Sequence, residues 1–315
     1  MHELGNHPGS SSGNMWERLH APGSARQLAA LRIFFGVYLL TVFSSDVFPL
    51  LEVLQPQLRV STWSLFPDAF VDFVLEHAVG SLIAVGLVST LMFTIGAGYR
   101  LASIVSCVSF VLLYAVYYRV TKSHTEWPYW IFTYLVFSLA PAADTWSVDS
   151  AVRKWRGGRL ERDSQSYRWP IEMIVLWIAT TYTAAGIAKL FPLRAGAEWL
   201  EGGVIRWIAM QFYYDSPIHW LLGSPAFDYA LQWPWTIMAV LAVATELAAA
   251  SFFFTRRLYL PVLVGLLGLH GGTYIVTGVN AFVIDALVLG AFLVPPEWFS
   301  DYGKDPELGK ATDRT

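Results

Sequence analysis

Residues 170–190 read PIEMIVLWIATTYTAAGIAKL, an apolar run of the length that crosses a membrane as one helix. Similar runs recur along the chain of 315 residues, of which 55% are hydrophobic and only 14% are charged, and the mean hydropathy is +0.45. A soluble domain normally carries about a quarter charged residues. The sequence therefore predicts an all-α, polytopic integral membrane protein whose surroundings are the lipid bilayer, and no nucleic-acid partner is expected.

We expect a helical bundle of about eight transmembrane helices, flanked by a disordered polar tail at 1–27 and a short polar tail at 299–315. The expected spans are roughly 28–48, 72–95, 100–119, 127–144, 170–190, 234–254, 258–277 and 280–294. The single cysteine, Cys107, falls inside an apolar run. An intrachain disulfide is therefore excluded, and the sequence indicates no thiol metal site.

Basic residues between the spans predict the orientation, because Lys and Arg prefer the cytoplasmic side. With eight spans, most of the basic loop residues fall on one side, and only Arg119 and Lys122 oppose this orientation. Those on the predicted cytoplasmic side are Arg18, Arg26, Arg100, Arg153, Lys154, Arg156, Arg159, Arg162, Arg168, Arg256 and Arg257. Both termini are therefore predicted to be cytoplasmic.

The longest loop, residues 191–233, is then extracytoplasmic and dense in Trp, Tyr and Phe, which favour the headgroup level of a membrane. Part of this loop has the spacing of an interfacial helix. The side chains expected to share its apolar face are Trp199, Val204, Trp207, Ile208 and Phe212.

Ionisable residues inside or beside the spans are costly to bury, so each is a candidate functional residue. Five of them are predicted in the outer half of the bilayer or at its midplane: Lys189, His124, His270, Asp285 and Glu246. Arg32 stands apart, near the inner end of the first span.

Each of these residues also has a purely structural explanation. Lys189 could extend its ammonium to the interface, and His270 could form an interhelical hydrogen bond. His124 could be a solvated loop residue, and Asp285 could cap its helix. Arg32 could extend inward or pair with a carboxylate. Glu246 is the strongest anomaly, because a carboxylate near the midplane must be protonated, paired or exposed to a polar cavity.

The common depth of the five residues favours a polar cavity that opens outward. Burial disfavours the charged form of a lysine, so Lys189 in such a cavity could act as a general base near neutral pH.

The sequence resembles the membrane domain of vitamin K-dependent γ-glutamyl carboxylase and its bacterial relatives, the HTTM (horizontally transferred transmembrane) proteins. The matching pattern is Y-x-x-A-G-x-x-K-L…W…G, formed here by Tyr182, Ala185–Gly186, Lys189–Leu190, Trp199 and Gly202. Further matches are His124 before an aromatic span, Trp146-Ser147-Val148-Asp149, Glu246, His270 and Pro296-Glu297-Trp298. The resemblance implies one membrane domain over about residues 28–298, in a bacterial cell (inner) membrane.

The resemblance implies a site on the extracytoplasmic side, with Lys189 as the base that deprotonates reduced vitamin K or menaquinol. His124 and His270 would hold or polarise the quinol oxygens, with Glu246, Asp285 and Tyr182 as supporting polar residues. Oxygen and CO2 would be co-substrates and a peptide glutamate the acceptor, in a carbon–carbon lyase reaction without a metal.

Two departures from the carboxylase leave other functions open. Ser123 replaces the usual asparagine before the histidine, and only a short tail follows the last predicted span, where the carboxylase has a large lumenal region. The alternatives are a non-catalytic quinone-, lipid- or peptide-binding protein or transporter, and an anchor for maturation of a secreted peptide.

Overall fold

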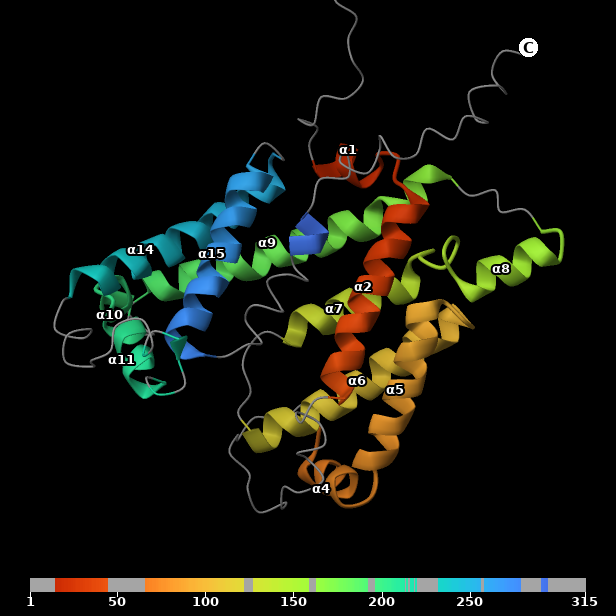
Figure 1. The fold of residues 1–315 in the computed structure, drawn as a ribbon, viewed down its shortest axis with the longest axis horizontal. Coiled ribbons are helices and arrows are strands. Elements are labelled where there is room, and N and C mark those ends of the chain that lie inside the picture. The colour runs from red at the N-terminus through yellow and green to blue at the C-terminus, as the bar shows by residue number, and fades with distance from the viewer. Residues whose placement is uncertain are drawn as a thin grey trace, which may run out of the picture. The chain divides into compact units, whose positions relative to one another are not determined.

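The computed structural model describes residues 15–44, 66–121, 127–158, 163–191, 196–212, 214, 216, 217, 219, 232–255, 258–278 and 290–293. Every regular element in these ranges is a helix, which confirms the all-α class (Figure 1). The helices form two compact units. We call residues 20–174 the N-terminal unit, and residues 175–298 with the segment up to residue 19 the C-terminal unit.

The N-terminal unit is built from long apolar helices that pack in chain order, α2 on α5, α5 on α6 and α6 on α7. Its elements are α2 (Ala25–Ser44), α4 (Asp68–His77), α5 (Val79–Ile95), α6 (Tyr99–Thr121), α7 (Trp127–Leu139), α8 (Val148–Trp155), η1 (Ser164–Tyr167) and the first turns of α9 (Trp169–Leu190). The core is aromatic, since the ring centroid of Phe35 lies 5.3 Å from that of Tyr134 and 5.7 Å from that of Phe137.

Hydroxyl groups join three helices inside this aromatic core. Ser106 on α6 lies 2.5 Å from the hydroxyl of Thr90 on α5 and 2.6 Å from that of Tyr134 on α7. Such interhelical hydrogen bonds satisfy polar groups that lipid cannot.

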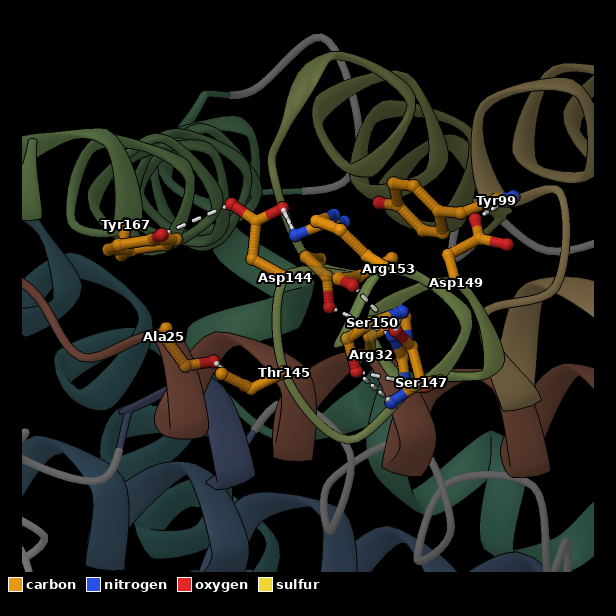
Figure 2. A network of polar contacts seen from close by, with 12 residues as sticks. Ala25, Arg32, Tyr99, Asp144, Thr145, Ser147, Asp149, Ser150, Arg153 and Tyr167 are labelled. Carbon is orange, nitrogen blue, oxygen red and sulfur yellow. Dashed lines mark hydrogen bonds and ion pairs between the residues drawn. The ribbon is translucent and has the colours of Figure 1, made fainter. Parts of the chain in front are cut away.

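A polar network closes one end of the N-terminal unit (Figure 2). Arg32 on α2 is fully buried and donates to the backbone oxygens of Ala142, at 2.9 Å, and Trp146, at 2.6 Å. The Asp149 carboxylate accepts from the backbone nitrogens of Gly98 and Tyr99, at 2.8 and 2.9 Å, where α6 begins. The segment after α7 is thereby fixed to α2 and to the start of α6. The expectation that Arg32 extends to water or pairs with a carboxylate is wrong, because backbone carbonyls bind it.

The C-terminal unit contains the remaining helices, and α14 and α15 pack on each other within it. They are α1 (Met15–Leu19), α9 from residue 175, α10 (Gly196–Leu200), α11 (Gly203–Gln211), α14 (Trp233–Ala248), the short η4 (Ala249–Phe253) and α15 (Tyr259–Thr277). The buried side chains of Ala209, Trp235 and Val276 join α11, α14 and α15. Arg18 on α1 is buried and donates to the Phe252 backbone oxygen at 2.6 Å.

In the described part of the chain, five helical segments are long and apolar enough to cross a membrane. They are Ala25–Ser44, Tyr99–Tyr117, Ser164–Leu190, Trp233–Phe253 and Tyr259–Thr277. The bent pair α4 and α5, with an angle of 78° between its helices, would add a sixth. Large apolar side chains are exposed along these helices, as expected where lipid replaces water. Examples are Val85, Val88, Leu91, Leu101, Ile104, Val108, Ile237, Val240, Leu241, Leu260 and Val264.

Several predicted boundaries are wrong. The span expected at 127–144 is a short helix that ends at Leu139, and Pro141 follows closely. The span expected at 72–95 bends at Ala78. The tail expected at 1–27 includes α1 and the start of α2. Of the expected span at 280–294, only residues 290–293 are described, so eight spans and cytoplasmic termini stay predictions.

The predicted interfacial helix of the long loop is two helices instead of one. α10 carries Trp199, whereas α11 carries Val204, Trp207 and Ile208, so Trp199 does not share a helix face with the other three. The break lies at Gly202, whose φ of 82° is a left-handed conformation that favours glycine. A Cβ there would also collide with the Trp235 backbone.

Candidate functional site

The C-terminal unit brings a partly buried lysine and a buried glutamate together. Lys189 near the end of α9 forms an ion pair through its Nζ with Oε1 of Glu246 on α14. Their side chains are 18% and 7% exposed, respectively. The two strongest single candidates from the sequence are therefore direct partners.

Close packing of α9 on α14 supports this ion pair. A Cβ added to Gly186, one helical turn before Lys189, would lie only 3.1 Å from the Glu246 Cβ and from side-chain atoms of Leu247. Tyr182, Gly186 and Lys189 recur at the spacing of one helix face. Glycine in the A-G-x-x-K-L segment thus lets the Glu246 stem approach α9.

An aromatic ring completes the surroundings of the ammonium group. The Lys189 Nζ lies 5.0 Å from the ring centroid of Trp199 on α10, within the range of a cation–π interaction. This contact accounts physically for Trp199 in the sequence pattern, and the turn at Gly202 accounts for the glycine that follows it.

The second carboxylate oxygen of the pair is open. Glu246 Oε2 is buried and has no hydrogen-bond partner among the described residues. A buried acceptor without a donor is costly. Oε1 of the same carboxylate avoids this cost because it binds Lys189, whereas Oε2 does not. Oε2 is therefore the atom in this site with the capacity to accept a hydroxyl group or a proton.

A second polar pair lies on the same face of α9. The Tyr182 hydroxyl is hydrogen bonded to Nε2 of His270 on α15, and Tyr182 is 5% exposed. Tyr182 and Lys189 are seven residues apart, which is about 10 Å along an α-helix. Two polar groups therefore line one face of α9, each completed by a different helix.

Three glycines near His270 in the sequence are loosely packed on α15. Cβ atoms added to Gly268, Gly271 or Gly272 would meet nothing within 4 Å. Packing among the described residues therefore does not require glycine at these three positions, in contrast to Gly186.

Four of the six site residues expected from the sequence are thus brought together in two pairs: Lys189 with Glu246, and Tyr182 with His270. The other two, His124 and Asp285, lie outside the described residues. Among the residues that the structure describes, no group of three or more His, Cys, Asp and Glu could hold a metal ion.

One buried charged pair escaped sequence reasoning. Glu172 lies inside the predicted span at 170–190, and its Oε1 is 2.8 Å from the Arg168 Nη2 atom. Both side chains are almost fully buried. The i, i+4 spacing of an arginine and a glutamate at the start of a helix is the sequence feature that could have predicted this pair.

The family comparison agrees with the pattern of residues around this site. A family model described as the HTTM domain matches residues 20–298. This family is linked to vitamin K-dependent carboxylase-like membrane proteins. Searches of curated proteins and of solved structures returned no match. The match spans nearly all of the chain, including both polar pairs on α9, and the protein belongs to the HTTM domain family.

Proposed function

We propose that this protein is a membrane enzyme that resembles vitamin K-dependent γ-carboxylase and deprotonates a reduced quinone at the Lys189–Glu246 pair. The observation that carries the proposal is the buried, open Oε2 of Glu246 beside a lysine ion pair. Oxygen, CO2 and a peptide at the extracytoplasmic face would be the other reactants, and both termini would be cytoplasmic.

The described residues suit a reduced quinone in two respects. Glu246 Oε2 offers a buried acceptor to a hydroxyl group, and the Tyr182–His270 pair offers a second polar group on the same face of α9. Glu246 would bind one hydroxyl, and the Tyr182–His270 pair would orient the ring. When bound, a reduced quinone would supply the electrons that reduce oxygen and the strong base that removes a proton from the peptide carbon.

The proton balance of the pair explains why both residues are needed. Lys189 Nζ and Glu246 Oε1 bind each other, and with the amine protonated and the carboxylate ionised their charges sum to zero. When Oε2 accepts a proton from a hydroxyl group, the pair gains one positive charge. The adjacent Trp199 ring stabilises the ammonium during this step. Lys189, with 18% of its side chain exposed, then returns the proton towards the surface.

Substitution of Lys189 distinguishes this enzyme from a non-catalytic binding protein. Lys189→Arg keeps a cation for Glu246 and for Trp199, but a guanidinium does not give up its proton in proteins. A binding protein would retain quinone with arginine at this position, whereas the enzyme would lose turnover. Lys189→Ala removes the cation and should impair both.

The experiment measures oxygen consumption and quinone epoxide with the purified protein in nanodiscs and reduced vitamin K or menaquinol. Bound quinone is quantified by chromatography in the same samples. We expect wild type to form epoxide and Lys189→Arg to bind quinone without forming it. If no epoxide forms with wild type and Lys189→Arg retains quinone, the protein is a binding protein and the enzymatic proposal is wrong.

A further inference from the structure

Helix α8 is attached to its own unit by its polar side (Figure 2). Ser147 caps its first turn, and Asp149 accepts from the backbone nitrogens at the start of α6. Ser150 is buried, and Arg153 lies 3.7 Å from the Asp144 carboxylate. These contacts all fall on one side of the helix.

The opposite side of α8 is apolar and exposed. Val148, Ala151, Val152 and Trp155 recur at i, i+3, i+4 and i+7, which places them on one face. Val148 is 43% exposed, Val152 39% and Trp155 85%. In a soluble protein such an apolar face packs against the core. In α8 the polar side contacts the unit instead, and the apolar face is exposed.

The contacts of α8 place it at the end of membrane-spanning helices. Asp149 binds the start of α6, and the preceding Thr145 donates to the Ala25 backbone oxygen at the start of α2, at 3.0 Å. Both α2 and α6 are long enough to cross a membrane. From this position α8 points away from the other helices of the unit (Figure 1). Its apolar face is thus available at a membrane boundary.

Positive charge flanks the exposed apolar face. Lys154 and Arg156 are both exposed, and Arg159 and Arg162 follow in the sequence. An apolar stripe with lysine and arginine beside it is typical of helices that lie in the headgroup region and attract anionic lipids.

We propose that α8 is a surface anchor that inserts Trp155 and its apolar neighbours into the headgroup boundary, while Lys154 and Arg156 bind anionic phospholipids. Charge complementarity and the adjacent membrane-spanning helices favour a lipid surface over a protein partner. This anchor would hold the segment 140–158, and with it the polar network around Arg32, at a fixed depth in the membrane. It does not depend on the proposed enzymatic function.

A fluorescent label at one position measures the depth of α8. Cys107→Ser removes the single, buried cysteine, and Ala151→Cys then introduces a labelling site on the exposed apolar face. Gln165→Cys, at an exposed polar position of η1, is the matched control. Both labelled full-length proteins are placed in nanodiscs of phosphatidylcholine, with or without phosphatidylglycerol, and the neutral quencher acrylamide is added.

We expect the label at position 151 to emit at shorter wavelength and to be quenched several-fold less than the label at 165. Phosphatidylglycerol should increase this protection, and Lys154→Gln with Arg156→Gln should remove the increase. Equal quenching at 151 and 165 in both lipids would overturn the proposal. Protection that is the same with and without phosphatidylglycerol would overturn the recognition of anionic lipid.

Discussion

Both units of this protein bury charge among apolar helices, and they accommodate it differently. In the N-terminal unit, Arg32 is fully buried and two of its nitrogen atoms donate to backbone oxygens. In the C-terminal unit, Lys189 binds Glu246, whose second oxygen has no partner among the described residues. A charge that binds the backbone fixes a segment in place, whereas an open carboxylate oxygen leaves a position for a ligand or a proton.

This difference distinguishes a structural role from a functional role for charged residues in membrane helices. Intramembrane charge alone suggests function for Arg32 and for Glu246 equally. The identity of the partners distinguishes them, because Arg32 holds the loop between α7 and α8 to α2. Substitutions in both units test this contrast, in order of expected effect.

Removing either member of the Lys189–Glu246 pair should have the largest effect. We expect Lys189→Met or Glu246→Met to lower quinol-dependent oxygen consumption by about 100- to 10,000-fold, as for loss of a general base. Each single substitution also leaves a buried charge unpaired, which should cost about 3 kcal/mol of unfolding free energy.

The double variant Lys189→Met/Glu246→Met sharpens this test. Two apolar side chains can replace a buried ion pair with little loss of stability, so thermal unfolding should return towards wild type. Activity should stay lost. Recovery of both would show that the pair is only structural, and the contrast between the units would fail.

Arg32→Met should destabilise the N-terminal unit by about 2–4 kcal/mol. The reason is that the buried oxygen of Ala142 and the partly buried oxygen of Trp146 lose their donors. Thermal unfolding followed by circular dichroism measures the loss. Arg26→Met, at an exposed position of the same helix, is the control and should change stability by a few tenths of a kcal/mol at most. Equal effects of the two substitutions would contradict a structural role for Arg32.

Asp149→Asn should have a smaller effect, about 1 kcal/mol. An amide retains one acceptor oxygen but loses the charge and the second acceptor at the start of α6. The same unfolding measurement with Asp68→Asn, at an exposed residue in the first turn of α4, provides the comparison. The prediction fails if Asp68→Asn is as harmful as Asp149→Asn.

Two glycine substitutions should have effects no larger than that of Asp149→Asn, and of opposite signs. Gly186→Ala places a Cβ 3.1 Å from Glu246 and Leu247, so we expect a loss of about 1 kcal/mol. Gly272→Ala meets open space, and alanine favours a helix over glycine by up to about 1 kcal/mol. Unfolding temperatures of the two variants give the signs. A stabilising Gly186→Ala would contradict close packing of α9 on α14.

Apolar run length was sufficient to predict the helical class and the long helices, because a membrane forces backbone groups to be satisfied within each segment. It did not predict the bend at Ala78, although the composition changes there, from α4 with its acidic residues and His77 to the uncharged α5. Nor did it predict the end of α7 at Leu139, because apolar residues continue past the proline that follows.

For the site, the sequence placed Lys189, Glu246 and His270 at similar depth without pairing them. Depth follows from position along a span, but pairing depends on the rotation of each helix about its axis. The packing at Gly186 and the position of Trp199 on α10 determine that rotation locally, and both depend on distant segments. The Tyr182–His270 pair escaped prediction for the same reason.

Arg18 has a practical consequence for expression and labelling of this protein. The family match begins at residue 20, so a chain trimmed to the matched region would lack Arg18. Its donation to the Phe252 carbonyl would then be lost in η4, which directly follows α14, the helix that carries Glu246. Affinity tags are therefore better joined ahead of residue 15 than at the domain boundary, and shortened chains are poor standards for activity.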